Sequence, residues 1–271
     1  MKKQTKKFEK QYLKVRNSIE RKGISMAKKM IQAHYLAYME RLKTLGISAY
    51  QQIEIPEQIT ERFFKMYYPM SAPLAVMTYE NMEKQAGQKA EKDVKKAVTN
   101  SIFQSKLTDI VNTTAGQKIK TITHTSVETI KGVIRGVLDE ADTAGWGVPE
   151  TTSKIFKAVG QNLIGNGYAR ARSIAQTELI SASNQASQFA ADKAAADYGV
   201  RYRKFWSTSG LEGIRDSHLF AEQYSNDKDG LQPDEPFDMG NGNFMMYPGE
   251  PSGPAEEVIN CRCTVMQEVF I

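Results

Sequence analysis

The stretch Ala194–Trp206, AAADYGVRYRKFW, marks the point where the chain changes from helix to strand. Ahead of it, Tyr168–Tyr198 is rich in alanine, which has the highest helix propensity, and Gly199 is a residue type that commonly ends helices. Residues 201–206 then alternate like a strand with two different faces. Beyond them helical periodicity stops, and glycine and proline become frequent. We therefore expect a long helix followed by a small module with short strands.

Earlier in the chain the pattern predicts several helices separated by turn signals. The first segment has one apolar face at helical spacing, formed by Phe8, Tyr12, Val15 and Ile19. We expect Gly23 to break this helix and Gly46 to end the next one. Further along, Gly145 and Pro149 separate a long amphipathic helix from a short one, which is expected to end near Gly160.

These patterns predict an α+β fold that is mostly α. The expected domains are an extended helical region, residues 1–165, and a C-terminal module, residues 166–271, in which a long helix packs on short antiparallel strands. Two cysteines in 271 residues do not form a disulfide framework. No apolar run approaches the roughly 20 residues that span a bilayer, so we expect no membrane partner.

The positive charge of the protein is concentrated in the first 22 residues. This N-terminal arm has nine basic and two acidic residues, a net charge of +7, whereas the whole chain carries +5. The basic residues are Lys2, Lys3, Lys6, Lys7, Lys10, Lys14, Arg16, Arg21 and Lys22. Such an arm suits contact with double-stranded DNA or with an acidic protein surface. The alternative is a solvated helix whose lysines serve solubility.

Both cysteines lie one residue apart near the C-terminus, and with His218 they form a set of three soft metal ligands. Zinc takes four ligands in a structural site, so Asp216, Glu250 or water would complete a site made by Cys261, Cys263 and His218. A second alternative is a nucleophilic cysteine with His218 as its base. A third is that the thiols pack as small apolar groups beside a hydrogen-bonded histidine, in which case no cofactor is bound.

Several motifs in the C-terminal module follow one another in a characteristic order. They are RARSIAQTE at 170–178, RDSH at 215–218, YPGEP at 247–251 and INCRC at 259–263. Together, over about residues 168–266, they resemble the Mu F-like head-morphogenesis family, the minor head proteins of tailed bacteriophages. The chain departs from the family pattern at Gln176, where arginine is usual, and before Arg215, where only Glu212 offers an acidic group.

The resemblance implies a minor capsid protein present in few copies at the portal vertex. Such a protein acts in head assembly, or in DNA packaging or ejection, and contacts the portal protein and other head proteins. It is expected inside the phage head near the portal, and in the bacterial host cytoplasm during assembly. In this interpretation the protein is no enzyme, and its polar motif residues hold the module together: Arg172, Glu178, Asn184, Arg215, His218, Asn260, Cys261, Arg262 and Cys263.

The alternative function is an enzyme that the phage delivers with its DNA. Members of the resembled family occur fused to toxin domains, which supports this alternative. The enzyme would be a metal-dependent nuclease or a transferase centred on His218, Cys261 and Cys263. The sequence has no phosphate-binding loop and no pair of carboxylates with a clear division between acid and base.

Overall fold

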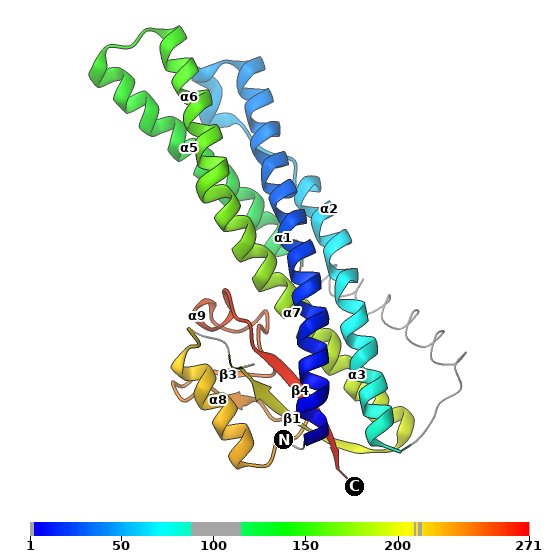
Figure 1. Ribbon diagram of the computed structural model, residues 1–271. Helices are drawn as coiled ribbons and strands as arrows, with labels where there is room; N and C mark the ends of the chain where they lie inside the picture. Colours follow the sequence, from blue (N-terminus) through cyan, green and yellow to red (C-terminus); the bar gives the residue numbers. More distant parts are fainter. Residues whose placement is uncertain (1–2, 88–114, 209, 211–212, 271) are drawn as a thin grey trace. The chain divides into compact units, whose positions relative to one another are not determined.

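The computed structural model describes residues 3–87, 115–208, 210 and 213–270 (Figure 1). The fold is α+β and mostly helical, with short antiparallel strands in the C-terminal part, as the sequence predicts. The predictions that concern Lys2 and Glu212 fall outside the described residues, and so does the side chain of Lys3.

The chain divides into two compact units, and neither is continuous in sequence. The strand unit consists of Met1–Gly23, Tyr67–Ile110 and Ala175–Ile271, and the helical unit consists of Ile24–Met66 and Val111–Ile174. This division differs from a single boundary near residue 165. The reason is that α1 (Lys3–Leu45) and α7 (Tyr168–Tyr198) each contribute residues to both units.

The helical unit contains, between its parts of α1 and α7, a series of further helices. They are η1 (Ile47–Gln52), α2 (Gln58–Tyr67), α5 (Ala115–Ala144), α6 (Val148–Asn162) and the π-helical turn η3 (Leu163–Gly167). Gly46 and Gly145 adopt positive φ values of 82° and 69° where α1 and α5 end, which confirms both predicted helix ends.

The chain stays helical at two predicted helix ends, and at Gly23 buried neighbours outweigh the low helix propensity of glycine. Gly23 lies inside α1, which continues from Lys3 to Leu45, and Ile19 and Ala27 on either side are buried. Glycine in a helix interior costs only about 1 kcal/mol relative to alanine. Likewise α6 continues past Gly160 and passes through η3 directly into α7.

The strand unit is organised around the pair formed by β1 (Arg201–Ser207) and β4 (Thr264–Phe270). These strands run antiparallel and side by side (Figure 1), with Trp206 opposite Val265 and Tyr202 opposite Val269. The other elements are η2 (Tyr68–Ser71), α3 (Ala72–Gln85), α8 (Asp216–Asp227), β2 (Phe237–Asp238), β3 (Phe244–Met245) and α9 (Ala255–Val258). A two-stranded sheet is not stable alone, so these helices must bury it.

Two hydrophobic cores cover the two ends of this strand pair. At one end, Tyr202 and Val269 pack with alanines of α7 and with Tyr79 and Met82 of α3. At the other end, Trp206 and Val265 belong to a core that also contains both cysteines. The functional motifs of the module are gathered around this second core.

The first turns of α1 belong to the strand unit and are amphipathic, as predicted. Phe8, Tyr12 and Ile19 are buried, and the Tyr12 hydroxyl lies 2.7 Å from Oγ of Ser187 on α7. Burial of apolar side chains on this face fixes the arm to the body of the unit. The arm is therefore a packed helix whose opposite face carries the lysines.

His34 is fully buried in the helical unit and is held in a hydrogen-bonded network. Its Nδ1 lies 3.0 Å from Oγ of Ser126, and its Nε2 lies 2.9 Å from Oγ1 of Thr60. Arg170 donates to the same Ser126 hydroxyl at 2.7 Å. Burial, together with the nearby Arg170 charge, lowers the pKa of His34 to about 4, so the imidazole is neutral in the folded protein.

The pKa of His34 predicts a specific loss of stability in acid. Between pH 6.5 and pH 4 the unfolded chain binds more protons at this residue than the folded chain, so stability falls as pH drops through this window. From pH 7 to pH 4 the wild type should lose about 3 kcal/mol more than the His34→Gln variant. Denaturant titrations followed by circular dichroism measure this difference. His124→Gln, at an exposed position of α5, is the matched control, and parallel losses in wild type and H34Q would contradict the assignment.

Candidate functional site

Asn184 of α7 connects two motifs that are far apart in sequence. Its Nδ2 donates to the carbonyl oxygen of Pro248 at 2.8 Å and to that of Cys263 at 3.1 Å. Its Oδ1 accepts a hydrogen bond from the backbone N–H of Val265 at 3.0 Å. The side chain of Asn184 is buried, so water cannot replace it as the hydrogen-bond partner of these backbone groups. One amide thus joins the Tyr-Pro-Gly turn and the start of β4 to the long helix.

The Tyr-Pro-Gly turn lies directly against the backbone of α7. Gly249 has a φ of 74°, and a Cβ atom at this position would lie 3.1 Å from Cγ2 of Ile180 and 3.2 Å from the backbone nitrogen of Ser181. Only glycine combines this left-handed conformation with such a close approach. This close approach places the carbonyl of Pro248 within hydrogen-bonding distance of Asn184.

The Asn-Cys-Arg-Cys segment is held from both sides of the strand unit. Asn260 has a positive φ of 58°, and its N–H donates to Oγ1 of Thr177 on α7 at 3.0 Å. Arg16 of α1 is buried, and its Nη1 donates to the carbonyl of Arg262 at 2.8 Å and to Oγ1 of Thr264 at 2.5 Å. These contacts fix the backbone of the segment that carries both thiols.

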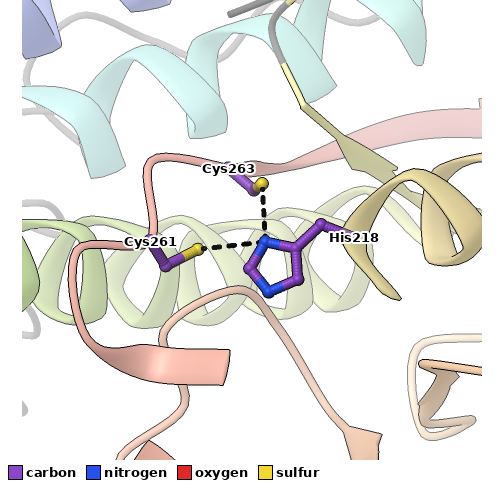
Figure 2. Close-up of side chains that lie close together, drawn as sticks. All are labelled: His218, Cys261 and Cys263. Atoms are coloured by element: carbon purple, nitrogen blue, oxygen red, sulfur yellow. Dashed lines mark hydrogen bonds between the residues drawn. The ribbon is translucent and has the colours of Figure 1, made fainter. Parts of the chain in front are cut away.

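His218 points its ring toward the two thiols. It is the third residue of α8, and its Nδ1 lies 3.3 Å from Sγ of Cys263 and 3.9 Å from Sγ of Cys261 (Figure 2). Its ring also packs edge-on against Trp206, with centroids 5.2 Å apart. All three polar side chains are almost completely buried, with exposed fractions of 2%, 1% and 3% for His218, Cys261 and Cys263.

Glu257 of α9 lies behind the histidine. Its Oε2 is 3.0 Å from Nε2 of His218, which is an ion-pair distance without the alignment of a good hydrogen bond. The same carboxylate accepts hydrogen bonds from Ser217 at 2.8 Å and from Asn241 at 2.7 Å. Burial opposes ionisation, but these donors and the adjacent imidazole hold the pKa of Glu257 below its ordinary value.

The two thiols affect each other's ionisation. A hydrogen bond from Cys263 lowers the pKa of Cys261 well below its ordinary value, against the effect of burial and with help from His218. The same bond, together with burial, raises the pKa of Cys263. A thiolate is the reactive and metal-binding form of cysteine, and the directions of the two shifts make Cys261 the more readily ionised sulfur.

A small cavity of about 70 Å³ adjoins the three side chains. Besides His218, Cys261 and Cys263, its lining includes Thr208, Arg215 and Asn260. Pockets that take drug-sized ligands have volumes of about 300–1,000 Å³. This cavity has room for a few water molecules, since one water occupies about 30 Å³ of liquid.

The structure brings together most, but not all, of the predicted polar set. Arg215 caps the segment by donating to the carbonyl of Ile259 at 2.5 Å, and Nη2 of Arg262 lies 3.5 Å from Glu20. Glu178 is buried on α7. Arg172 departs from the set because it is exposed and belongs to the helical unit.

Sequence reasoning missed several residues of the site. Glu20 of α1 lies 3.5 Å from Nη2 of Arg262, and no local pattern marks it. Thr177 lies within the RARSIAQTE motif but was not among the predicted site residues, although its Oγ1 accepts the N–H of Asn260. Glu257 lies three residues before Asn260, next to a second glutamate, Glu256, and the sequence does not show which of the two faces His218. Asp216 and Glu250, considered as fourth metal ligands, do not join the three ligand atoms, the only such group within the described residues.

Most of the predicted DNA-binding residues that the structure describes are exposed, but one of them is buried. Lys6, Lys7, Lys10 and Lys14 are exposed on the outer face of α1, as are Arg21 and Lys22. Arg16, by contrast, is buried and bonded to the C-terminal segment. Its inclusion in the DNA-binding set is therefore wrong, because its face of the helix is the packed one.

Comparisons with known proteins identify no relative of this chain. No protein-family model matches it, no curated protein matches it, and no solved structure matches it. Within the residues that the structure describes, no helix is long and apolar enough to cross a membrane.

The Asn184 network predicts a large loss of stability on truncation. Asn184→Ala leaves the carbonyls of Pro248 and Cys263 and the N–H of Val265 without their partner, so we expect a loss of about 3 kcal/mol or more. Denaturant unfolding followed by Trp206 fluorescence, in a Trp146→Phe background, measures it. Asn226→Ala, at an exposed position of α8, is the control and should stay within about 0.5 kcal/mol. A similarly small effect of Asn184→Ala would overturn the role given to this side chain.

Proposed function

We propose that this chain is a minor head protein of a tailed bacteriophage that acts at the portal vertex and is not an enzyme. The observation that carries the proposal is the ordered set of motifs, from Arg170–Glu178 to Ile259–Cys263, which resembles the Mu F-like family. The fold supports it, because Asn184, His218 and the Asn-Cys-Arg-Cys segment interact within one core although they are distant in sequence. The motifs thus serve to build a module.

The site geometry favours a structural role over catalysis. The two thiols and the imidazole are almost fully buried, and the adjoining cavity of about 70 Å³ is far smaller than a nucleotide or peptide pocket. A nucleophilic cysteine requires contact with its substrate, and no opening of that size adjoins these sulfurs in the described part of the chain.

The helical unit offers an apolar surface for the portal protein. Leu45, at the end of α1, and Val148, at the start of α6, are exposed at 57% and 76%. A hollow of about 930 Å³ lies at this end of the unit, and its lining includes Ile47, Trp146 and Val148. Exposed apolar side chains around a hollow are typical of protein-binding surfaces. In our proposal a segment of the portal protein fills this hollow.

Portal binding at this hollow is testable by co-purification with the cognate portal protein. The double variant Leu45→Asp and Val148→Asp should bind at least about ten-fold more weakly, since it removes two aliphatic contacts and buries charge. Leu219→Asp with Phe244→Asp, at exposed apolar positions of the strand unit, is the control and should bind normally. Absence of binding by the wild type would refute the proposed function, whereas binding unchanged in the first variant would refute only the surface.

The lysines of α1 support a second property, non-specific binding of double-stranded DNA. Lys6, Lys7, Lys10 and Lys14 are exposed at spacings of one, three and four residues along the helix. Such a row can approach a phosphate backbone and release its counterions. Deleting the arm would be a poor test, because Phe8, Tyr12 and Arg16 of the same helix are part of the folded unit.

Neutralising the four lysines to glutamine tests DNA binding without removing the packed face. We expect weaker binding and a shallower dependence of log Kd on log salt. The slope of that plot should decrease by about 3–4 if all four lysines contact phosphates. Fluorescence anisotropy with a labelled duplex over a range of salt concentrations measures both. The control replaces four exposed lysines elsewhere, Lys29, Lys84, Lys120 and Lys157, by glutamine. Equal losses in both variants would show that charge alone, and not the arm, governs binding.

A further inference from the structure

We propose that Cys261, Cys263 and His218 bind one zinc ion, with water from the adjoining cavity as its fourth ligand. The proposal goes beyond the role in the phage head and does not depend on it. Zinc is bound in proteins by thiolate sulfur and imidazole nitrogen, and three protein ligands with one water is a common arrangement. The three ligand atoms here lie within 4.8 Å of one another.

The distances match those expected around a tetrahedral zinc. Bond lengths of about 2.3 Å to sulfur and about 2.0 Å to nitrogen place sulfur and nitrogen about 3.5 Å apart, and two sulfurs about 3.8 Å apart. The two observed Sγ to Nδ1 distances, 3.3 Å and 3.9 Å, lie on either side of the expected value. The sulfurs lie within 4.8 Å of each other, so an ion could draw them together by small side-chain rotations.

The histidine is oriented as a zinc ligand would be. Glu257 lies 3.0 Å from Nε2, and the opposite ring nitrogen, Nδ1, faces both sulfurs (Figure 2). A carboxylate on the far nitrogen is the usual partner of a zinc-bound histidine. Ser217 and Asn241 in turn donate hydrogen bonds to Glu257. The residue beside the histidine is therefore itself fixed in position.

The ligands come from two elements that the ion would join. His218 lies in the first turn of α8, whereas Cys261 and Cys263 lie between α9 and β4. The backbone of both cysteines is already fixed, since the N–H of Cys261 bonds to Val258 and the carbonyl of Cys263 accepts from Asn184. Binding therefore needs little ordering of the chain, which favours affinity.

The charge balance and the open position also suit zinc. Two thiolates neutralise the charge of the divalent ion itself, which lowers the cost of burying it. In the described part of the chain no fourth side chain joins the three, and the cavity of about 70 Å³ beside them can hold the water that completes the tetrahedron. We expect the ion to clamp α8 to the C-terminal segment.

Metal analysis of the full-length protein, purified with reductant from zinc-supplemented cells, tests the site. Mass spectrometry of the metal content should find one zinc per chain in the wild type and almost none in Cys261→Ser, Cys263→Ser or His218→Asn. His124→Asn, at an exposed histidine, is the control and should retain full zinc. Glu257→Gln keeps the ligands but should lower zinc affinity by about 10–100-fold in a chelator competition.

Cobalt spectroscopy keeps the proposal testable if a ligand variant fails to fold. Zinc-free wild type titrated with Co²⁺ should develop thiolate-to-cobalt charge-transfer bands and the visible bands of a tetrahedral site, and Zn²⁺ should abolish both. Absence of stoichiometric zinc together with absence of these bands would overturn the proposal. A Cys261–Cys263 disulfide that persists with reductant, seen as the loss of two hydrogens by intact mass, would also overturn it.

Discussion

The strand unit depends on the hydrogen bonds that Asn184 makes to the C-terminal segment. A pair of short strands cannot bury its own apolar faces, so β1 and β4 are stable only while α7 stays packed on them. Asn184 supplies that link with directional bonds to three backbone groups, from Pro248, Cys263 and Val265. Because those groups are buried, the link cannot be replaced by solvent, and the position of β4 follows from it.

The same link explains why the sequence motifs take the form they do. Gly249 is required where the Tyr-Pro-Gly turn contacts the backbone of α7, and Asn260 adopts a positive φ where the chain turns toward the cysteines. Arg16 closes the segment from the side of α1. Gly249, Asn260 and Arg16 thus each satisfy a backbone constraint of the module.

Among the residues that the structure describes, the imidazole and two thiols are the group of side chains arranged to hold a metal ion. A buried histidine could be satisfied by one hydrogen bond, yet His218 has Glu257 on one nitrogen and both sulfurs on the other. Such an arrangement places one imidazole nitrogen and two sulfurs together in a buried environment. The cavity beside them is of the size of a water cluster, so a metal ion suits the site better than an organic substrate.

Local sequence patterns were sufficient for most helix ends and for the change to strands at Gly199, because alanine content, apolar spacing and glycine act over one or two turns. They also indicated the C-terminal motif residues as a group. They failed at Gly23 and Arg16, where burial against distant residues overrides local preference. Only the tertiary structure decided which side chains meet, since Glu257 on the ring of His218 and Asn184 on β4 are contacts across long stretches of chain that no periodicity encodes.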